Sequence, residues 1–94
     1  MTVAAVHVEG DADWPVARLT GEIDLSNVDD LTFAVEAAVS NRALGVVLDL
    51  TDVTYLDSTG LRLIFRLLRK LQDRQQVLHL VVPDDALLGA RGGS

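Results

Sequence analysis

The chain has 94 residues, 49% hydrophobic and 23% charged, a composition that fits one small globular domain and excludes a disordered chain. Its formal net charge of −6 argues against a nucleic-acid-binding protein, because neutralising phosphates requires a basic surface. The lack of cysteine excludes a disulfide framework, a thiolate nucleophile and a cysteine-ligated metal.

The sequence has neither the pattern of an export signal at its start nor that of a membrane-spanning helix further along. Residues 1–13 contain three acidic residues and no lysine or arginine, whereas a signal peptide starts with positive charge. The longest apolar stretches are interrupted by arginines, which makes them unsuited to crossing a bilayer. We therefore expect a cytoplasmic protein that does not insert into a membrane.

A hairpin and a helix are predicted for the first half of the chain. Residues 3–8 and 14–20 are expected to pair as strands around an acidic turn at 9–13. Ser26 is expected to cap a helix that ends near Asn41. The inner stripe of this helix is predicted to consist of Val28, Leu31, Val35, Ala38 and Val39.

A strand and a second helix are predicted for the centre of the chain. Residues 45–50 are rich in valine and leucine, as expected of a central strand covered on both faces. The helix begins at Asp57-Ser58-Thr59-Gly60, where any of the first three residues can cap it and Gly60 lets another backbone approach closely. Its buried stripe is predicted from the helical spacing of Leu61, Ile64, Phe65, Leu68 and Leu71.

The end of the chain is predicted to be incomplete as a fold. Residues 77–82 are expected to form a further buried strand, and a third helix begins near Pro83 but is too short to be stable. Residues 91–94 are expected to be a disordered end. The truncation predicts an exposed C-terminal sheet edge, which favours either a homo-oligomer or a marginally stable domain.

The alternation of strands and helices predicts the fold class. Strands separated by helices pair in parallel, whereas the hairpin is antiparallel, so the sheet is mixed. We expect a single α/β domain over residues 1–94, a small sandwich with a mixed sheet of about four strands, helices packed on it and a truncated C-terminal helix.

Three short blocks carry a resemblance to a known family. They are Gly21-Glu22-Ile23-Asp24, Leu48-Asp49-Leu50 and Asp57-Ser58-Thr59-Gly60-Leu61. With these blocks at this separation, roughly residues 3–85 resemble the STAS family, the anti-sigma factor antagonists and related regulatory domains. The resemblance implies that a partner anti-sigma factor with serine kinase activity phosphorylates Ser58 and binds the unmodified form. It also implies that Asp24 lies close to Ser58.

The residues themselves leave the role of Ser58 open. A serine at a helix start is explained by capping alone, and Thr59 is an alternative phosphoacceptor. The helix start also carries a positive dipole end and free amides, so the local structure would tolerate a phosphate there.

Partner contacts are predicted at the start of the second helix and along one side of it. Leu63 and Leu67 fall off the predicted buried stripe and are flanked by arginines, so they are expected to be exposed interface anchors. A run of charged residues on a helix is more often a simple solvated surface than a docking face. The predicted partner-binding residues are Asp24, Asp57, Ser58, Thr59, Gly60, Arg62, Leu63, Arg66 and Leu67.

Enzymatic and metal-binding interpretations have little support. The Asp57–Gly60 block resembles the Asp-Ser/Thr-Gly motif of aspartic proteases, but an extra residue precedes the glycine and no second copy exists. His7 and His79 lie in predicted strands far in sequence from Ser58, so a catalytic triad has only its residue types in its favour. Four aspartates without a ligand spacing are expected to solvate turns: Asp24, Asp49, Asp52 and Asp57. We expect no catalytic residue, cofactor or metal.

Two functions remain for a binding module. The first is an anti-sigma factor antagonist that sequesters an anti-sigma factor kinase while Ser58 is unphosphorylated and so releases a sigma factor for transcription. The second is an accessory STAS domain of a transporter or a stress-sensing complex, which acts by protein contact without phosphorylation.

Overall fold

The computed structural model describes residues 4–82. Within this range the chain forms four strands and two helices, β1 (Ala4–Gly10), β2 (Pro15–Ile23), α1 (Val28–Ala38), β3 (Gly45–Leu56), α2 (Ser58–Asp73) and β4 (Val77–Val81). The strands form one sheet in the order β1-β2-β3-β4. β1 and β2 are antiparallel, whereas β2, β3 and β4 are parallel, so the predicted mixed sheet with packed helices is confirmed.

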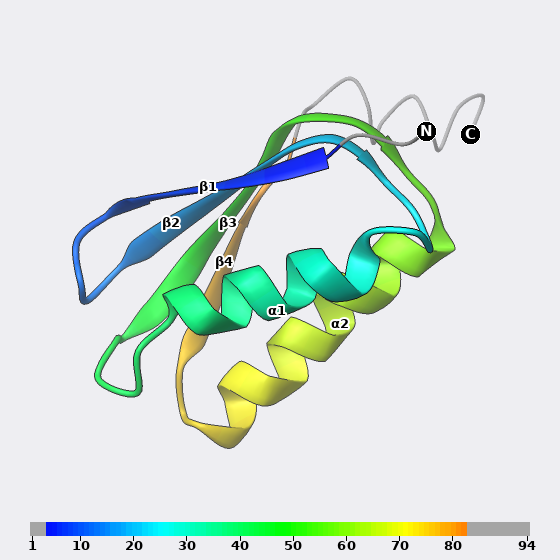
Figure 1. Ribbon diagram of the computed structural model, residues 1–94. Coiled ribbons are helices and arrows are strands. Elements are labelled where there is room, and N and C mark those ends of the chain that lie inside the picture. Colours follow the sequence, from blue (N-terminus) through cyan, green and yellow to red (C-terminus); the bar gives the residue numbers. More distant parts are fainter. Residues whose placement is uncertain (1–3, 83–94) are drawn as a thin grey trace.

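Both helices cover the same face of the sheet (Figure 1). α1 packs against β1 and β2, and α2 packs against β3 and β4. Both parallel crossovers step in the same direction along the sheet, so connections of one hand place both helices on one side. The expectation that the central strand is covered on both faces is therefore wrong for the described residues. Burial alternates along β3. Val46 and Leu48 face the helices and are fully buried, whereas Val47 and Asp49 face the other side and are only half-buried.

Among residues 4–82, β4 is an edge strand and is mostly exposed, so the prediction of a buried strand is also wrong. Val77 and Leu80 keep about half of their surface in contact with solvent, at 50% and 43%. An edge strand is paired on one side only, which leaves backbone groups available on the other. The predicted third helix and the predicted disordered end at 91–94 lie outside the described residues, and self-association remains a prediction.

The inner stripe of α1 is confirmed at Val28, Leu31, Val35 and Val39, whereas Ala38 is only half-buried, and the helix ends at Ala38, before Asn41. Its start differs, because the N-cap position is Asn27 and not Ser26, and no side chain caps the helix. The buried residues of α1, together with Val39 directly after it, are Val28, Leu31, Thr32, Val35 and Val39.

α2 is rotated relative to the predicted face, since of the predicted stripe only Leu71 is buried, while Ile64 and Leu68 are half-buried. Leu63 and Leu67 are each only 2% exposed, whereas Leu61 and Phe65 are 46% and 65% exposed. The expectation that Leu63 and Leu67 are exposed interface anchors is therefore wrong. The contact that sets the rotation lies at Gly60, because a Cβ added there would collide with the Leu56 side chain and crowd Ile23.

The Gly60 contact explains the whole buried stripe. Residues three, seven and eleven positions after a sheet-facing residue lie on the same side of a helix. From Gly60 these positions are Leu63, Leu67 and Leu71, and all three are buried.

This rotation predicts the stability of two matched variants. Leu67→Ala should lower the free energy of unfolding by about 2–5 kcal/mol, because it opens a cavity in the core. Phe65→Ala should change it by less than about 0.5 kcal/mol, because the ring lies largely in solvent. Urea unfolding of both variants measures the difference, and a larger loss for Phe65→Ala than for Leu67→Ala would contradict the observed rotation.

Candidate functional site

The candidate site lies where β2 and β3 end side by side. The last paired residues of this parallel ladder are Ile23 and Leu56. Asp24 and Asp57 follow them directly, so the turn before α1 and the start of α2 leave the sheet at the same edge (Figure 1). The carboxyl ends of adjacent parallel strands are a common place for binding sites in α/β sheets.

Asp57 caps α2, which decides between the three candidates that the sequence left open. Its Oδ1 accepts hydrogen bonds from the backbone amides of Thr59 at 2.9 Å and Gly60 at 3.2 Å. Its carbonyl oxygen accepts from the amide of Leu61 at 3.1 Å. The expectation of free amides for a phosphate is therefore wrong at Thr59 and Gly60, since the Asp57 carboxylate already occupies them.

Ser58 is the first residue of α2 and is exposed, whereas Thr59 is half-buried. Among the described residues, the Ser58 hydroxyl has no hydrogen-bond partner. Ser58 is thus neither the cap nor a packing residue, and its hydroxyl is open to an approaching protein.

The turn that carries Asp24 is held by its own side chains. The Asp24 Oδ1 accepts from the Ser26 amide at 2.9 Å and from the Ser26 Oγ at 2.6 Å. Asn27 closes the turn from the other side, because its Oδ1 accepts from the Asp24 amide at 3.1 Å and its Nδ2 donates to the Glu22 carbonyl at 2.8 Å. Ser26 is therefore engaged with Asp24 one residue too early to cap α1.

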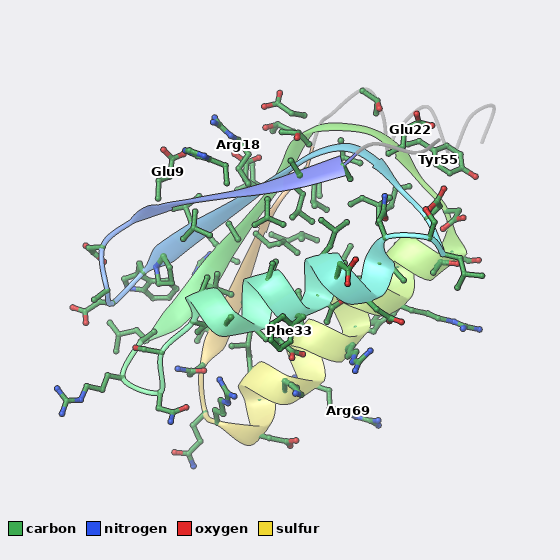
Figure 2. All side chains as sticks on the ribbon, viewed as in Figure 1. Glu9, Arg18, Glu22, Phe33, Tyr55 and Arg69 are labelled. Atoms are coloured by element: carbon green, nitrogen blue, oxygen red, sulfur yellow. The ribbon has the colours of Figure 1, made fainter. Side chains whose placement is uncertain are left out.

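The paired strands position this turn. In Figure 2 the labelled Glu22 and Tyr55 lie next to each other near the strand ends. They are partners in the β2–β3 ladder, two residues before Asp24 and Asp57 respectively. The backbone pairing of β2 with β3 thus positions the site.

A groove of about 170 Å³ separates the starts of the two helices. Its walls include Leu25, Val28, Thr59, Arg62 and Leu63. Leu25 is 77% exposed, so an apolar side chain marks the rim. Arg66 bridges to Asp29 across the groove at 3.7 Å, a pair that adds little stability because both side chains are well exposed.

In the structure, the predicted partner-binding residues fall into two groups, one at the strand ends and one along α2. Asp24, Asp57, Ser58, Thr59 and Gly60 gather at the strand ends and the start of α2. Arg62 and Arg66 follow on the exposed side of α2, whereas Leu63 and Leu67 belong to the core. The exposure of Leu61 and Phe65 was missed, although the packing of Gly60 against the sheet would have indicated it.

The described residues contain no group of three or more histidine or carboxylate side chains able to hold a metal. The β2–β3 ladder separates the aspartates, because Asp49 pairs with Arg18 and Asp52 pairs with Thr20, well before the strand ends. Hydrogen bonds from the Thr51 hydroxyl and amide, aided by Arg18, hold the pKa of Asp49 below its ordinary value. Asp49 and Asp52 lie within β3, so the expectation that they solvate turns is wrong, and Asp49 instead bonds Thr51 beside the irregularity in the ladder between Arg18 and Thr20.

The histidines are also remote from Ser58. His79 pairs with Val47, nine residues before the end of β3, which corresponds to about 30 Å along a strand. Its ring lies edge-on to Trp14, with ring centroids 5.3 Å apart. His7 pairs with Arg18 on β2, also away from the strand ends. A catalytic triad with Ser58 is not assembled.

Comparison with known proteins agrees with the sequence blocks. The family model of the STAS domain matches residues 4–89, and the chain belongs to this family. An anti-sigma-B factor antagonist of Listeria monocytogenes is 31% identical over 87 residues, which cover 93% of this chain and 76% of the relative.

Solved structures show the same fold. An anti-sigma factor antagonist from Mycobacterium paratuberculosis superposes with a TM-score of 0.79 at 26% identity, covering 94% of this chain and 74% of the other. The anti-sigma factor antagonist SpoIIAA in its unphosphorylated form superposes with a TM-score of 0.69 at 22% identity, covering 84% and 70%. Neither α1 nor α2 is long and apolar enough to cross a membrane.

The capping geometry predicts how α2 responds to substitution at its start. Asp57→Ala should lower the free energy of unfolding by about 0.5–2 kcal/mol, because two amides lose their acceptor. Asp57→Asn keeps an acceptor and should stay close to wild type, as should Ser58→Ala. Chemical unfolding of the three variants distinguishes them. A loss at Ser58→Ala as large as that at Asp57→Ala would show that Ser58 shares the capping role.

Proposed function

We propose that this chain is an anti-sigma factor antagonist whose unmodified form sequesters an anti-sigma factor with serine kinase activity and so frees a sigma factor for transcription. The observation that carries the proposal is the exposed, unpartnered Ser58 hydroxyl at the first residue of α2, beside the strand ends that hold Asp24 and Asp57. The family membership and the antagonist relatives support it.

Charge is the physical basis of the proposed switch. A phosphate on Ser58 adds about 1.5 to 2 negative charges at neutral pH. The neighbouring Asp57 carboxylate already holds the Thr59 and Gly60 amides, so the phosphate stays on the surface and does not enter the helix cap. The helix dipole favours negative charge at this end, so the fold tolerates the modification while a docked partner meets new repulsion.

Exposure favours Ser58 over Thr59 as the phosphoacceptor. A kinase must bring the hydroxyl into its own active site, which requires the side chain to be accessible. Ser58 is exposed, whereas Thr59 is half-buried and lines the groove between the helices. Thr59 is therefore assigned to the docking surface.

In this proposal the chain acts in the cytoplasm as a binding module, without catalytic residues and without a cofactor. The partner-binding surface combines the Asp24 turn with the start of α2, from Asp57 to Gly60, and with the exposed Arg62 and Arg66. An accessory domain in a larger complex would use the same surface without modification, so phosphorylation distinguishes the two functions.

The proposal predicts the behaviour of Ser58 variants with the purified anti-sigma factor kinase of the same organism. Incubation with the kinase and ATP should add one phosphate to Ser58, seen by mass spectrometry, and none to Ser58→Ala. Ser58→Ala should retain binding in calorimetry, whereas Ser58→Asp should bind at least about tenfold more weakly because a charge enters the interface. Phosphate on Thr59 alone, or equal affinity for Ser58→Asp and wild type, would contradict the proposal.

A further inference from the structure

One exposed face of α2 combines apolar and basic side chains with Ser58. Leu61, Arg62, Phe65 and Arg69 lie three, four, seven and eleven positions after Ser58, the spacing that places residues on one side of a helix. All five are exposed, and Arg69 extends outward from α2 (Figure 2). These five residues are called the α2 outer face below.

The apolar centre of this face is large for a solvent-facing helix surface. Phe65 is 65% exposed and Leu61, one turn earlier, is 46% exposed. Phe65 and Arg69 also border a hollow of about 450 Å³ on the same helix. An exposed aromatic ring beside a hollow and flanked by arginines has the composition of a protein interface core.

The charges indicate which partner chemistry fits the face. Arg66 and Lys70 of α2 pair with Asp29 and Glu36 of α1, at 3.7 Å and 3.2 Å. Arg62 and Arg69, by contrast, form no ion pair within the described part of the chain. Two guanidinium groups are too few to hold a nucleic acid on a chain of net charge −6, whereas they match carboxylates around an apolar patch.

We propose that the α2 outer face is the docking surface for an apolar patch rimmed by carboxylates on the anti-sigma factor, with Phe65 as its central anchor. This inference rests on the proposed function and specifies its surface. A phosphate on Ser58 lies one helical turn before Leu61 and Arg62. It takes the Arg62 guanidinium as its own partner and places charge beside the apolar anchor, so one modification removes both kinds of contact.

Matched substitutions test the docking surface. Phe33 on α1 is 73% exposed and lies outside the α2 outer face, so Phe33→Ser is the control for Phe65→Ser. Titration of the purified anti-sigma factor kinase in a calorimeter should show binding at least about tenfold weaker for Phe65→Ser, as for a central interface residue, and within about twofold of wild type for Phe33→Ser. Both variants should melt close to wild type.

Arg62 has a matched control as well. Arg62→Gln should weaken binding by about threefold to tenfold and reduce its salt dependence, whereas Arg42→Gln, in an exposed loop, should do neither. In the phosphorylated protein, pairing with Arg62 should lower the second pKa of the phosphate from its ordinary value of about 6. A ³¹P NMR titration should therefore show a higher phosphate pKa in Arg62→Gln than in Arg69→Gln.

The outcomes separate this inference from the proposed function. If wild type binds and Ser58→Asp does not, but Phe65→Ser binds like Phe33→Ser, the docking surface is wrong and the proposed function stands. If wild type does not bind the kinase at all, both the proposed function and the docking surface are wrong. A wild-type dimer in sedimentation that Phe65→Ser dissociates would make a second copy the occupant and overturn the inference. An unchanged phosphate pKa in Arg62→Gln would remove the role of Arg62.

Discussion

The packing of Gly60 against Leu56 and Ile23 is the contact on which the rest of the structure depends. These two side chains are the last partners of the parallel β2–β3 ladder, so the contact joins the sheet directly to the first turn of α2. It fixes the rotation of the helix, which sends Leu63 and Leu67 into the core. The same rotation turns Ser58, Leu61 and Phe65 toward solvent, so core and candidate site follow from one close approach.

Much of the fold was predictable because local signals and the global arrangement agree. The acidic turn of the hairpin, the valine-rich centre of β3 and the block at Asp57 correctly indicated a turn, a central strand and a helix start, although not which residue caps the helix or that β3 is covered on one face. The rotation of α2 was not predictable from spacing alone. Its apolar residues occupy two adjacent stripes, and both have the period of an amphipathic helix. Only a tertiary contact, the one at Gly60, selects between them.

The sequence predicted that the Asp24 turn and the start of α2 lie together, but it misplaced Leu63 and Leu67, which are core residues, and it could not predict the hydrogen bonding at the start of α2. The sequence blocks name Asp24 and Ser58, and the parallel register explains why segments more than thirty residues apart meet. Spacing could not show that the Asp57 carboxylate takes the amides of Thr59 and Gly60. That hydrogen bonding changes the proposed mechanism, in which a phosphate on Ser58 would act on the surface and on Arg62 and would not enter the helix cap.

The central claim is that binding occurs at the strand ends and on the outer side of α2. Backbone NMR of the ¹⁵N-labelled chain, titrated with the unlabelled anti-sigma factor kinase, tests it most directly. The account predicts that the largest changes fall on the turn from Asp24 to Asn27 and on α2 from Ser58 to Arg69. It also predicts that the β1–β2 turn is unaffected. Changes concentrated on β4 or on that turn, with α2 unaffected, would contradict the account.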